Sequence, residues 1–421
     1  MSRNRRIANC FKTYPMPPPV VRPPLTAAAF EATVLRSRLM DPERLLELSA
    51  AAGGAAAPTA DALAGHLVAA GALTRFQAEK MLGGLWQGLA VGPYRILCPV
   101  GRGGMGIVYL AHRLRPKKPP RLVAVKLLSP KRAATEPRTL ARFVREMDIG
   151  RELPPHPHLT RTLEATSPDG VHVLAMEFVP GPTVKQQVSE GGPLPVARAA
   201  RVVADAANGL LAVHQAGYVH RDVKPANVVV TTGGRAKVLD FGFALRRGEL
   251  PTADPTILGG QGYTLGTMDY LPPEQAANAV VVGAETDVYS LGCTLYFAVG
   301  GRNPFPDGTP QEKMRMHRTM EPMPLPALVP GVPDDFARLV RWMMAKRPEQ
   351  RPQSMDVIAR ELDRWADPVP KLLTPVALTD DWERRLLAGV EARWLAHRAA
   401  LANTVSAEDL VELVEERAKG G

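Results

Sequence analysis

The sequence predicts an α+β fold flanked by helical extensions at both ends. Between residues 94 and 366, strand-like and helix-like patterns alternate, which is typical of a domain built from both kinds of element. Residues 26–91 are rich in Ala and Leu and show helical periodicity, which predicts a small helical module. Residues 367–421 return to a helical pattern after the proline-punctuated linker DPVPKLLTPVALT.

The composition is that of an ordinary soluble globular protein, with 45% hydrophobic and 22% charged residues. Its 421 residues allow one large domain or a few smaller ones. The three cysteines, Cys10, Cys98 and Cys293, lie far apart and form no CxxC pair. Neither a disulfide framework nor a zinc site is therefore expected, and this cysteine usage predicts a cytoplasmic protein.

The start of the chain predicts neither a secretory signal nor a membrane segment. Residues 1–25 are basic and rich in proline, which predicts an extended, disordered leader. This leader lacks the apolar core of a signal peptide. No apolar run in the sequence reaches the ~18 residues that a bilayer requires, so no membrane span is expected.

The net charge is +10, and most of it falls in residues 94–366. Such a surplus indicates either a solvated basic surface or a groove for an anionic partner. Basic and aromatic residues are not interleaved, and no helix-turn-helix spacing is present. Nucleic acid is therefore not expected as the main ligand.

The two helical flanks carry patterns of packing or docking rather than of chemistry. In the first, residues 37–48 resemble residues 70–82, with Asp41 or Thr74 as the N-cap before each helix. A binding module and a plain helical extension both fit this weak repeat. Apolar residues of the tail recur on one predicted helical face: Trp382, Leu386, Val390, Trp394 and Leu401. We expect self-association or protein docking through these flanks.

A glycine cluster opens the central domain, in the segment VGRGGMGIVYLA at residues 100–111. Gly101, Gly103 and Gly106 fit the pattern GxGxxG, which by itself is weak. A dinucleotide-binding loop leads from a strand into a helix, whereas both segments that flank this cluster, YRILCPV and IVYLAHRL, are predicted strands. Glycines in such a hairpin let backbone N–H groups approach phosphates, although an ordinary glycine-rich hairpin has the same pattern.

Lys126 is a lone cation in the apolar, strand-like segment RLVAVKLLSP. Burying a lysine is costly unless it is paired, so this residue either reaches water at a strand edge or has an acidic partner. Glu146, on a predicted helix in RFVREMDIGREL, is the candidate partner. Such a pair could hold Lys126 against the phosphates of a nucleotide.

Oxygen-bearing side chains are concentrated in HRDVKPANVVV and, further along the chain, in VLDFGFA. Asn227 and Asp240 are hard oxygen ligands of the kind that Mg²⁺ takes, together with phosphate oxygens. Asp222 is then free to orient a hydroxyl nucleophile and accept its proton. Phosphoryl transfer depends mainly on such positioning and on charge neutralisation.

These motifs, in this order, resemble those of the eukaryotic-type protein kinases, and above all the bacterial Ser/Thr kinases. The resemblance covers residues 94–366. It implies a bilobal fold in which a small β-rich lobe (residues 94–179) lies over a larger helical lobe (residues 183–366), with ATP and Mg²⁺ between them. The implied partners are proteins with Ser or Thr acceptors.

The resemblance also implies a role for each residue that matches a kinase motif. Lys126, paired with Glu146, would contact the α- and β-phosphates. Asp222 would accept the proton of the acceptor hydroxyl, and Lys224 would steady the transferring phosphate. Met176 would be the gatekeeper. The residues around the nucleotide would be Val100, Gly101, Gly103, Gly104, Gly106, Val108, Ala124, Lys126, Met176, Glu177, Val179 and Val229.

The segment GTMDYLPPEQ matches the end of a kinase activation segment. By the resemblance, Glu274 would form a buried bridge with Arg351, and Asp287 would brace the catalytic loop. Lys224 and Thr267 match the Ser/Thr pattern, where tyrosine kinases carry other residues. The acceptors are therefore expected to be serine and threonine.

Arg221 directly precedes Asp222, which in the resemblance implies control by phosphorylation of the activation segment. A phosphate there would give Arg221 a charge-assisted partner. The candidate acceptors are Thr252, Thr256 and Thr264, each of which also fits an ordinary loop residue.

Two features depart from the kinase pattern. The stretch RPKKPP at residues 115–120 lengthens a turn, which a loop tolerates. At Gly150, four residues after Glu146, the family usually has a large apolar side chain that packs toward Phe241. Glycine within a helix costs roughly 1 kcal/mol relative to alanine. We therefore predict a helix that is easily displaced and an activity that is conditional.

The expected function is an active, Mg²⁺- and ATP-dependent protein Ser/Thr kinase that phosphorylates its own activation segment. The alternatives are a nucleotide-binding pseudokinase or scaffold and a small-molecule phosphotransferase of related fold. Degraded kinases usually lose the counterparts of Lys126, Asp222 or Asp240, and this sequence has all three. A small-molecule phosphotransferase would normally lack the full glycine loop and the GTMDYLPPEQ segment.

Overall fold

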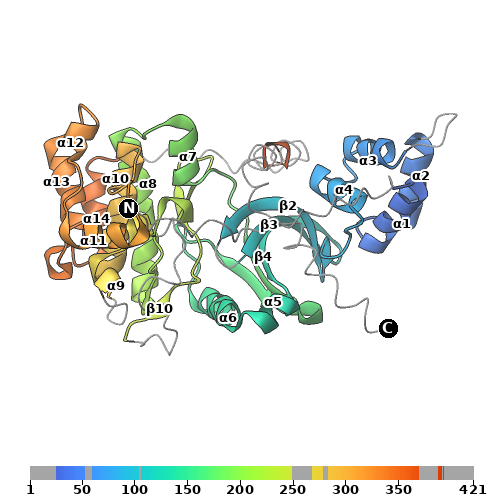
Figure 1. Ribbon diagram of the computed structural model, residues 1–421, viewed down its shortest axis with the longest axis horizontal. Helices are drawn as coiled ribbons and strands as arrows, with labels where there is room; N and C mark the ends of the chain where they lie inside the picture. Colours follow the sequence, from blue (N-terminus) through green and yellow to red (C-terminus); the bar gives the residue numbers. More distant parts are fainter. Residues whose placement is uncertain are drawn as a thin grey trace, which may run out of the picture. The chain divides into compact units, whose positions relative to one another are not determined.

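The computed structural model divides the chain into two compact units, Met1–Trp86 and Gln87–Gly421 (Figure 1). The structure describes residues 25–52, 59–103, 106–248, 268–277, 283–368, 387–390 and 392. The predicted leader, apart from Leu25, and most of the predicted tail helices fall outside these residues.

The first unit is built from short helices around a small apolar core. The helices are α1 (Ala27–Ser37), α2 (Pro42–Ala52), α3 (Ala60–Ala69) and α4 (Arg75–Leu82). Phe30 and Val34 of α1, Leu63 and Leu67 of α3, and Met81 of α4 are fully buried. Because helices this short are marginal in isolation, burial of these side chains is what stabilises the unit.

The helix pairs α1–α2 and α3–α4 repeat one another over a longer stretch than the sequence repeat covers. Thr26 and Thr59 cap α1 and α3 in the same way, each accepting the N–H of the third helical residue. The turns that follow place a left-handed residue at the corresponding position, Arg38 at φ 55° and Gly71 at φ 68°. Thr74 caps α4, as predicted. The unit is therefore a duplicated helix pair.

The second unit begins with an antiparallel sheet of six strands in the order β1-β2-β3-β4-β6-β5. The strands are β1 (Ala90–Val91), β2 (Tyr94–Gly103), β3 (Gly106–Arg115), β4 (Lys118–Leu128), β5 (Thr162–Thr166) and β6 (His172–Glu177). Gly103 of β2 lies opposite Gly106 of β3, so the glycine cluster joins two strands, as predicted.

The stretch RPKKPP contains the turn of the β3–β4 hairpin, and its last three residues belong to β4. Arg115 of β3 pairs with Lys118, which opens β4. Lys117, between them, adopts φ 56°, the left-handed conformation that tight hairpins use. The extra residues therefore extend the sheet.

Two helices connect β4 to β5 and cover one face of the sheet (Figure 1). They are α5 (Pro130–Thr135) and α6 (Pro137–Glu152). Phe143 and Met147 of α6 pack against Leu128 of β4 and Leu174 of β6 in a buried cluster. This packing fixes α6 on the sheet and carries Glu146 toward β4.

The rest of the second unit is mainly helical. Its helices are α7 (Val184–Gly191), α8 (Val196–Gln215), α9 (Pro273–Ala277), α10 (Ala284–Gly300), α11 (Pro310–Thr319), α12 (Leu325–Leu328), α13 (Asp334–Met343) and α14 (Met355–Asp363). The short strands β7 (Tyr218–Val219) and β10 (Leu245–Arg246) pair, as do β8 (Val228–Val230) and β9 (Ala236–Val238). The 3₁₀ turns are η1 (Pro168–Gly170), η2 (Pro225–Asn227), η3 (Met268–Tyr270) and η4 (Pro348–Gln350).

The helical lobe has its own apolar core, to which α8, α10, α13 and α14 all contribute. Both α8 and α10 are buried on most sides, as expected for central helices. The predicted α+β class, with a β-rich lobe followed by a helical lobe, is confirmed. In the described part of the chain, no helix is both long and apolar enough to span a bilayer.

Candidate active site

Lys126 is buried in β4, at 2% exposure, and has two carboxylate partners. Its Nζ lies 2.6 Å from Glu146 Oε2 on α6 and 3.5 Å from Asp240 Oδ1. Burial disfavours the charged amine, but Asp240 and Glu146 outweigh it and raise the pKa of Lys126. Of the two interpretations that the sequence left open, the paired lysine is therefore correct.

The strand register gathers several predicted nucleotide residues on one face of the sheet. Val108 of β3 lies opposite both Gly101 of β2 and Lys126 of β4. Ala124 of β4 lies opposite Met176 of β6. Ala124 and Lys126 share a face because side chains two apart in a strand point the same way. These residues therefore form a continuous surface around the Lys126 amine.

The other predicted nucleotide residues lie on neighbouring elements. Gly106 adopts φ 141°, a conformation that only glycine accepts readily, and a Cβ there would touch the Leu127 carbonyl at 3.4 Å. Val100 and Gly103 lie in β2, Glu177 ends β6, Val179 follows it, and Val229 is buried in β8. Gly104 lies outside the described residues.

Asp222 is buried, and both of its carboxylate oxygens accept hydrogen bonds. Lys224 Nζ donates to Oδ1 at 2.9 Å and to Oδ2 at 2.8 Å, and Asn227 Nδ2 donates to Oδ2 at 3.0 Å. Burial raises the pKa of Asp222 against the attraction of Lys224. The carboxylate is therefore fixed in position and is a better proton acceptor than an exposed aspartate.

Asn227 and Asp240 offer oxygen atoms that suit a divalent cation. Asn227 uses its amide nitrogen to contact Asp222, so its amide oxygen remains available. The Asn227 carbonyl accepts the N–H of Leu239, which brings Asn227 beside Asp240. One amide oxygen and one carboxylate match the few protein ligands that Mg²⁺ takes. No group of three or more His, Cys, Asp or Glu among the described residues offers another metal site.

The backbone before Asp222 is held by Asp287, which is fully buried on α10. The Asp287 carboxylate accepts the N–H groups of His220 and Arg221, at 2.8 Å each, and the ring N–H of His214 at 2.7 Å. Arg221 adopts φ 66°, which is costly for a residue with a side chain. The buried carboxylate therefore stabilises a strained segment next to Asp222.

Arg221 is 3% exposed, and its Nε and Nη2 atoms have no hydrogen-bond partner within the described ranges. A buried guanidinium without a partner is costly, so this position favours an anion. The predicted activation-segment residues Thr252, Thr256, Thr264 and Thr267 all lie outside the described residues.

Glu274 and Arg351 form the bidentate ion pair that the resemblance implied. Arg351 Nη1 and Nη2 lie 2.7 and 2.8 Å from the two Glu274 oxygens. The Arg351 side chain is fully buried and also donates to the carbonyls of Ala345, Glu285 and Lys346. This pair links α9 to the segment before α14.

One further ion pair, in which only the acid is buried, was missed at the sequence level. Asp205, which is fully buried on α8, accepts two bonds from Arg235, at 2.8 and 2.9 Å, and the N–H of Ala236 at 2.9 Å. The contacts fix α8 to β9, which leads to Asp240. The available signal was a single acid inside the apolar run VVADAA, because such an acid needs a partner when it is buried.

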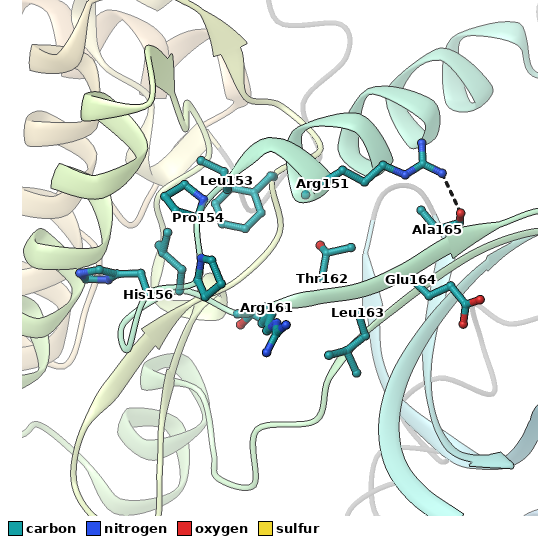
Figure 2. Close-up of a pocket in the computed structure, with 14 residues that line it drawn as sticks. Arg151, Leu153, Pro154, His156, Arg161, Thr162, Leu163, Glu164 and Ala165 are labelled. Carbon is teal, nitrogen blue, oxygen red and sulfur yellow. Dashed lines mark hydrogen bonds between the residues drawn. The ribbon is translucent and has the colours of Figure 1, made fainter. Parts of the chain in front are cut away.

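Gly150 belongs to the last turn of α6 and faces Thr162 of β5. Figure 2 shows Thr162 between this end of the helix and its own strand. A Cβ at this position would lie 2.2 Å from Thr162 Oγ1 and 3.0 Å from Thr162 Cβ. The glycine therefore permits a close helix–strand contact, and α6 continues unbroken through it to Glu152. The predicted ease of displacement of α6 stays a prediction.

Comparison with known proteins places these motifs in a broad family. The model of the protein kinase domain matches residues 94–362. The serine/threonine-protein kinase PknB of Mycobacterium leprae is 35% identical over 283 residues, which cover 65% of this chain and 44% of that protein. PknB of Mycobacterium tuberculosis (strain H37Rv) is 36% identical over 293 residues, 69% of this chain and 45% of that protein. The kinase AfsK of Streptomyces coelicolor is 33% identical over 270 residues, 64% and 32% of the two chains. The chain spans less than half the length of these relatives.

Proposed function

The chain belongs to the protein kinase family, and we propose that it transfers the γ-phosphate of ATP to serine and threonine hydroxyls of proteins. This proposal rests on two buried clusters of charged side chains, one around Lys126 and one around Asp222, in which every predicted member is present. Lys126 contacts Glu146 and Asp240. Asp222 contacts Lys224 and the side-chain amide of Asn227. A chain that only scaffolds has no need to keep both clusters charged and buried.

In this mechanism, the residues of the chain position the reactants and neutralise their charge. Lys126, fixed by Glu146, would hold the nucleotide phosphates. Asp222 would orient the acceptor hydroxyl and take its proton, and Lys224, bonded to Asp222, would face the transferring phosphate. Asn227 and Asp240 would hold Mg²⁺, which when bound supplies positive charge to the phosphates.

Phosphorylation of the activation segment is part of this proposal. The Arg221 guanidinium is buried beside Asp222, and two of its nitrogens lack partners within the described residues. A phosphorylated threonine would supply the missing anion through charge-assisted hydrogen bonds. Thr252, Thr256 and Thr264 remain the candidate acceptors, and Thr267 would help to hold Asp222.

The regions outside the kinase domain are proposed to bind protein substrates or other copies of the chain. The duplicated helix pair of residues 26–86 has its own apolar core, and its described part contains no group of three or more His, Cys, Asp or Glu that could hold a metal ion. Docking and self-association are therefore its proposed roles. The cysteine usage described above supports action in the cytoplasm.

Autophosphorylation tests this function. The purified chain, incubated with ATP and Mg²⁺, should label threonines between residues 252 and 264, as mapped by mass spectrometry. Asp222→Asn should slow labelling by about 100- to 10,000-fold, because it removes the proton acceptor. Asp307→Asn, an exposed residue, is the matched control and should label normally. ATP binding without any labelling, even after pre-phosphorylation by an active kinase, would favour the scaffold.

A further inference from the structure

Lys237, in the middle of β9, joins the helical lobe to the β-rich lobe through its side chain. Its Nζ lies 2.5 Å from Glu177 Oε1, at the end of β6, and donates to the Leu159 carbonyl at 3.2 Å. Both charged side chains are partly buried, at 20% and 23% exposure. A hydrogen bond between two charged groups is stronger than one between neutral groups, above all where water is partly excluded. This contact therefore fixes Glu177 relative to β9.

The strand register places Lys237 beside residues that are expected to surround the nucleotide. The backbone of Lys237 pairs with Val229 in the β8–β9 hairpin. Glu177 pairs with Val123, which directly precedes Ala124, in the sheet of the β-rich lobe. Val229 and Ala124 are both among the residues assigned above to the nucleotide, and they come from different lobes. One ion pair therefore links the two parts of the chain between which the nucleotide is expected.

The segment that connects the lobes, residues 177–183, is held against β8 at its far end by backbone contacts. The N–H of Val230 donates to the Pro182 carbonyl at 2.9 Å, and Thr183 forms a bridge with the same strand. Gly181 adopts φ 154°, and a Cβ there would lie 1.9 Å from the carbonyl oxygen of Val230. Only glycine permits so close an approach. The far end of the connecting segment is therefore fixed to the helical lobe.

The near end of the connecting segment depends on the Lys237 side chain. The N–H of Glu177 donates to the Arg161 carbonyl at 2.9 Å, and the N–H of Arg161 donates to Glu177 Oε1 at 3.1 Å. Arg161 belongs to the β-rich lobe, as does Val123, the strand partner of Glu177. Without Lys237, all the contacts of Glu177 with described residues given above would be to the β-rich lobe.

We propose that Lys237 is a positioning residue for the nucleotide. Through Glu177 it would hold the backbone of residues 177–179 in a fixed place relative to Val229, in the geometry that the adenine ring requires. This inference rests on the proposed function, because it assumes that ATP binds between the lobes. A site that is held in place before the ligand arrives loses less conformational freedom on binding. The phosphates would be held by Lys126, so loss of Lys237 should weaken recognition of adenine and spare the phosphates.

Binding of three probes to the full chain tests this role by calorimetry. The probes are adenosine, a non-hydrolysable ATP analogue with Mg²⁺, and inorganic tripolyphosphate with Mg²⁺. We expect Lys237→Met to weaken adenosine and the ATP analogue alike, by about three- to tenfold, and to leave tripolyphosphate unchanged. Lys118→Met, at an exposed lysine that opens β4, is the matched control and should leave all three affinities unchanged. Equal weakening of all three probes, or an unchanged affinity for adenosine, would overturn the proposal.

A double-mutant cycle tests whether Lys237 acts through Glu177. Glu177→Gln should weaken adenosine by a factor similar to that of Lys237→Met, and the double variant should be no weaker than either single variant. Lys237→Arg, which keeps the charge, should restore part of the affinity. Factors that multiply in the double variant would overturn the route through Glu177.

Kinetics separates positioning from chemistry. In a chain that phosphorylates as proposed above, Lys237→Met should raise the KM for ATP by about three- to tenfold and leave kcat unchanged, because the loss falls on binding. A lower kcat with an unchanged KM would overturn the positioning role, as would an unmodified chain that does not bind adenosine. An unmodified chain that binds adenosine but transfers no phosphate would overturn the proposed function alone, because the binding tests of Lys237 need no catalysis.

Discussion

At the scale of single residues, we expect the loss of a buried ion pair to lower the free energy of unfolding more than the loss of an exposed one. The Arg351 side chain is fully buried, and all its acceptors come from the surrounding fold. Arg347, close by in sequence, forms a pair with Glu349 in which both side chains are more than half exposed. The two arginines therefore offer a matched comparison within one segment.

We expect Glu274→Gln to lower the free energy of unfolding by about 3–5 kcal/mol, because it leaves the Arg351 charge buried without its partner. Glu349→Gln, the control, should leave the free energy of unfolding almost unchanged, because an exposed pair contributes little. Urea unfolding of both variants measures these differences. Similar values for the two would show that burial of Arg351 does not govern the stability of this pair.

His317 predicts a pH dependence of stability. Its ring is buried against Phe305 and Tyr289, and burial lowers its pKa to about 3. An unfolded histidine titrates near ~6.5, so the unfolded chain takes up a proton that the folded chain cannot. Above pH ~6.5 the His317 ring is neutral in both states and does not change the stability. As the pH drops from there toward 3, the free energy of unfolding falls by about 1.4 kcal/mol per pH unit.

Unfolding at pH 7, 6 and 5 checks this dependence. The His317→Gln variant should lose less stability over this range than the unmodified chain, since glutamine has no proton to take up. Parallel losses in the two proteins would assign the acid sensitivity to other groups.

At the scale of elements, the contact between α6 and β5 depends on Gly150. Gly150→Ala should lower the free energy of unfolding by about 1–3 kcal/mol, because the new Cβ meets Thr162. In the double variant with Thr162→Ala, the loss should be smaller than the sum of the two single losses. A leucine at position 150 would meet the same obstacle.

Gly191, at the end of α7, is the control for this prediction. A Cβ there would meet nothing within 4 Å, so Gly191→Ala should be neutral or stabilise by up to about 1 kcal/mol. Chemical unfolding of the four variants measures the coupling. Strict additivity of the Gly150 and Thr162 substitutions would contradict a direct contact between them.

At the scale of the whole molecule, the chain consists of two compact units, each with its own apolar core. We expect two unfolding transitions in calorimetry. An ATP analogue with Mg²⁺ should shift only the transition of the kinase unit, by about 2.7 kcal/mol at a concentration 100 times its Kd, because a ligand stabilises only the unit that binds it. A single transition that shifts as a whole would contradict independent units.

Much of the candidate site could be predicted because its chemistry needs particular residue types at short spacings. Asp222, Lys224 and Asn227 lie within one segment, and the structure brings them into direct contact. The strand–glycine–strand hairpin followed from the same local patterns. The continuation of β4 into the RPKKPP stretch was not predicted, because prolines and lysines there imply a loop unless the neighbouring strand pairs with them.

The sequence by itself determined the class of fold, the family and the identity of the charged residues, since periodicity and motif order are local properties of a chain. Only the tertiary structure decided that Asp240 is a second carboxylate partner of Lys126 and that Thr162 packs against the α6 backbone at Gly150. It also decided that a cavity remains beside Phe241. These features depend on strand register and on the packing of segments far apart in the chain. Close packing is sensitive to changes as small as one methylene group, and residue types alone do not specify it.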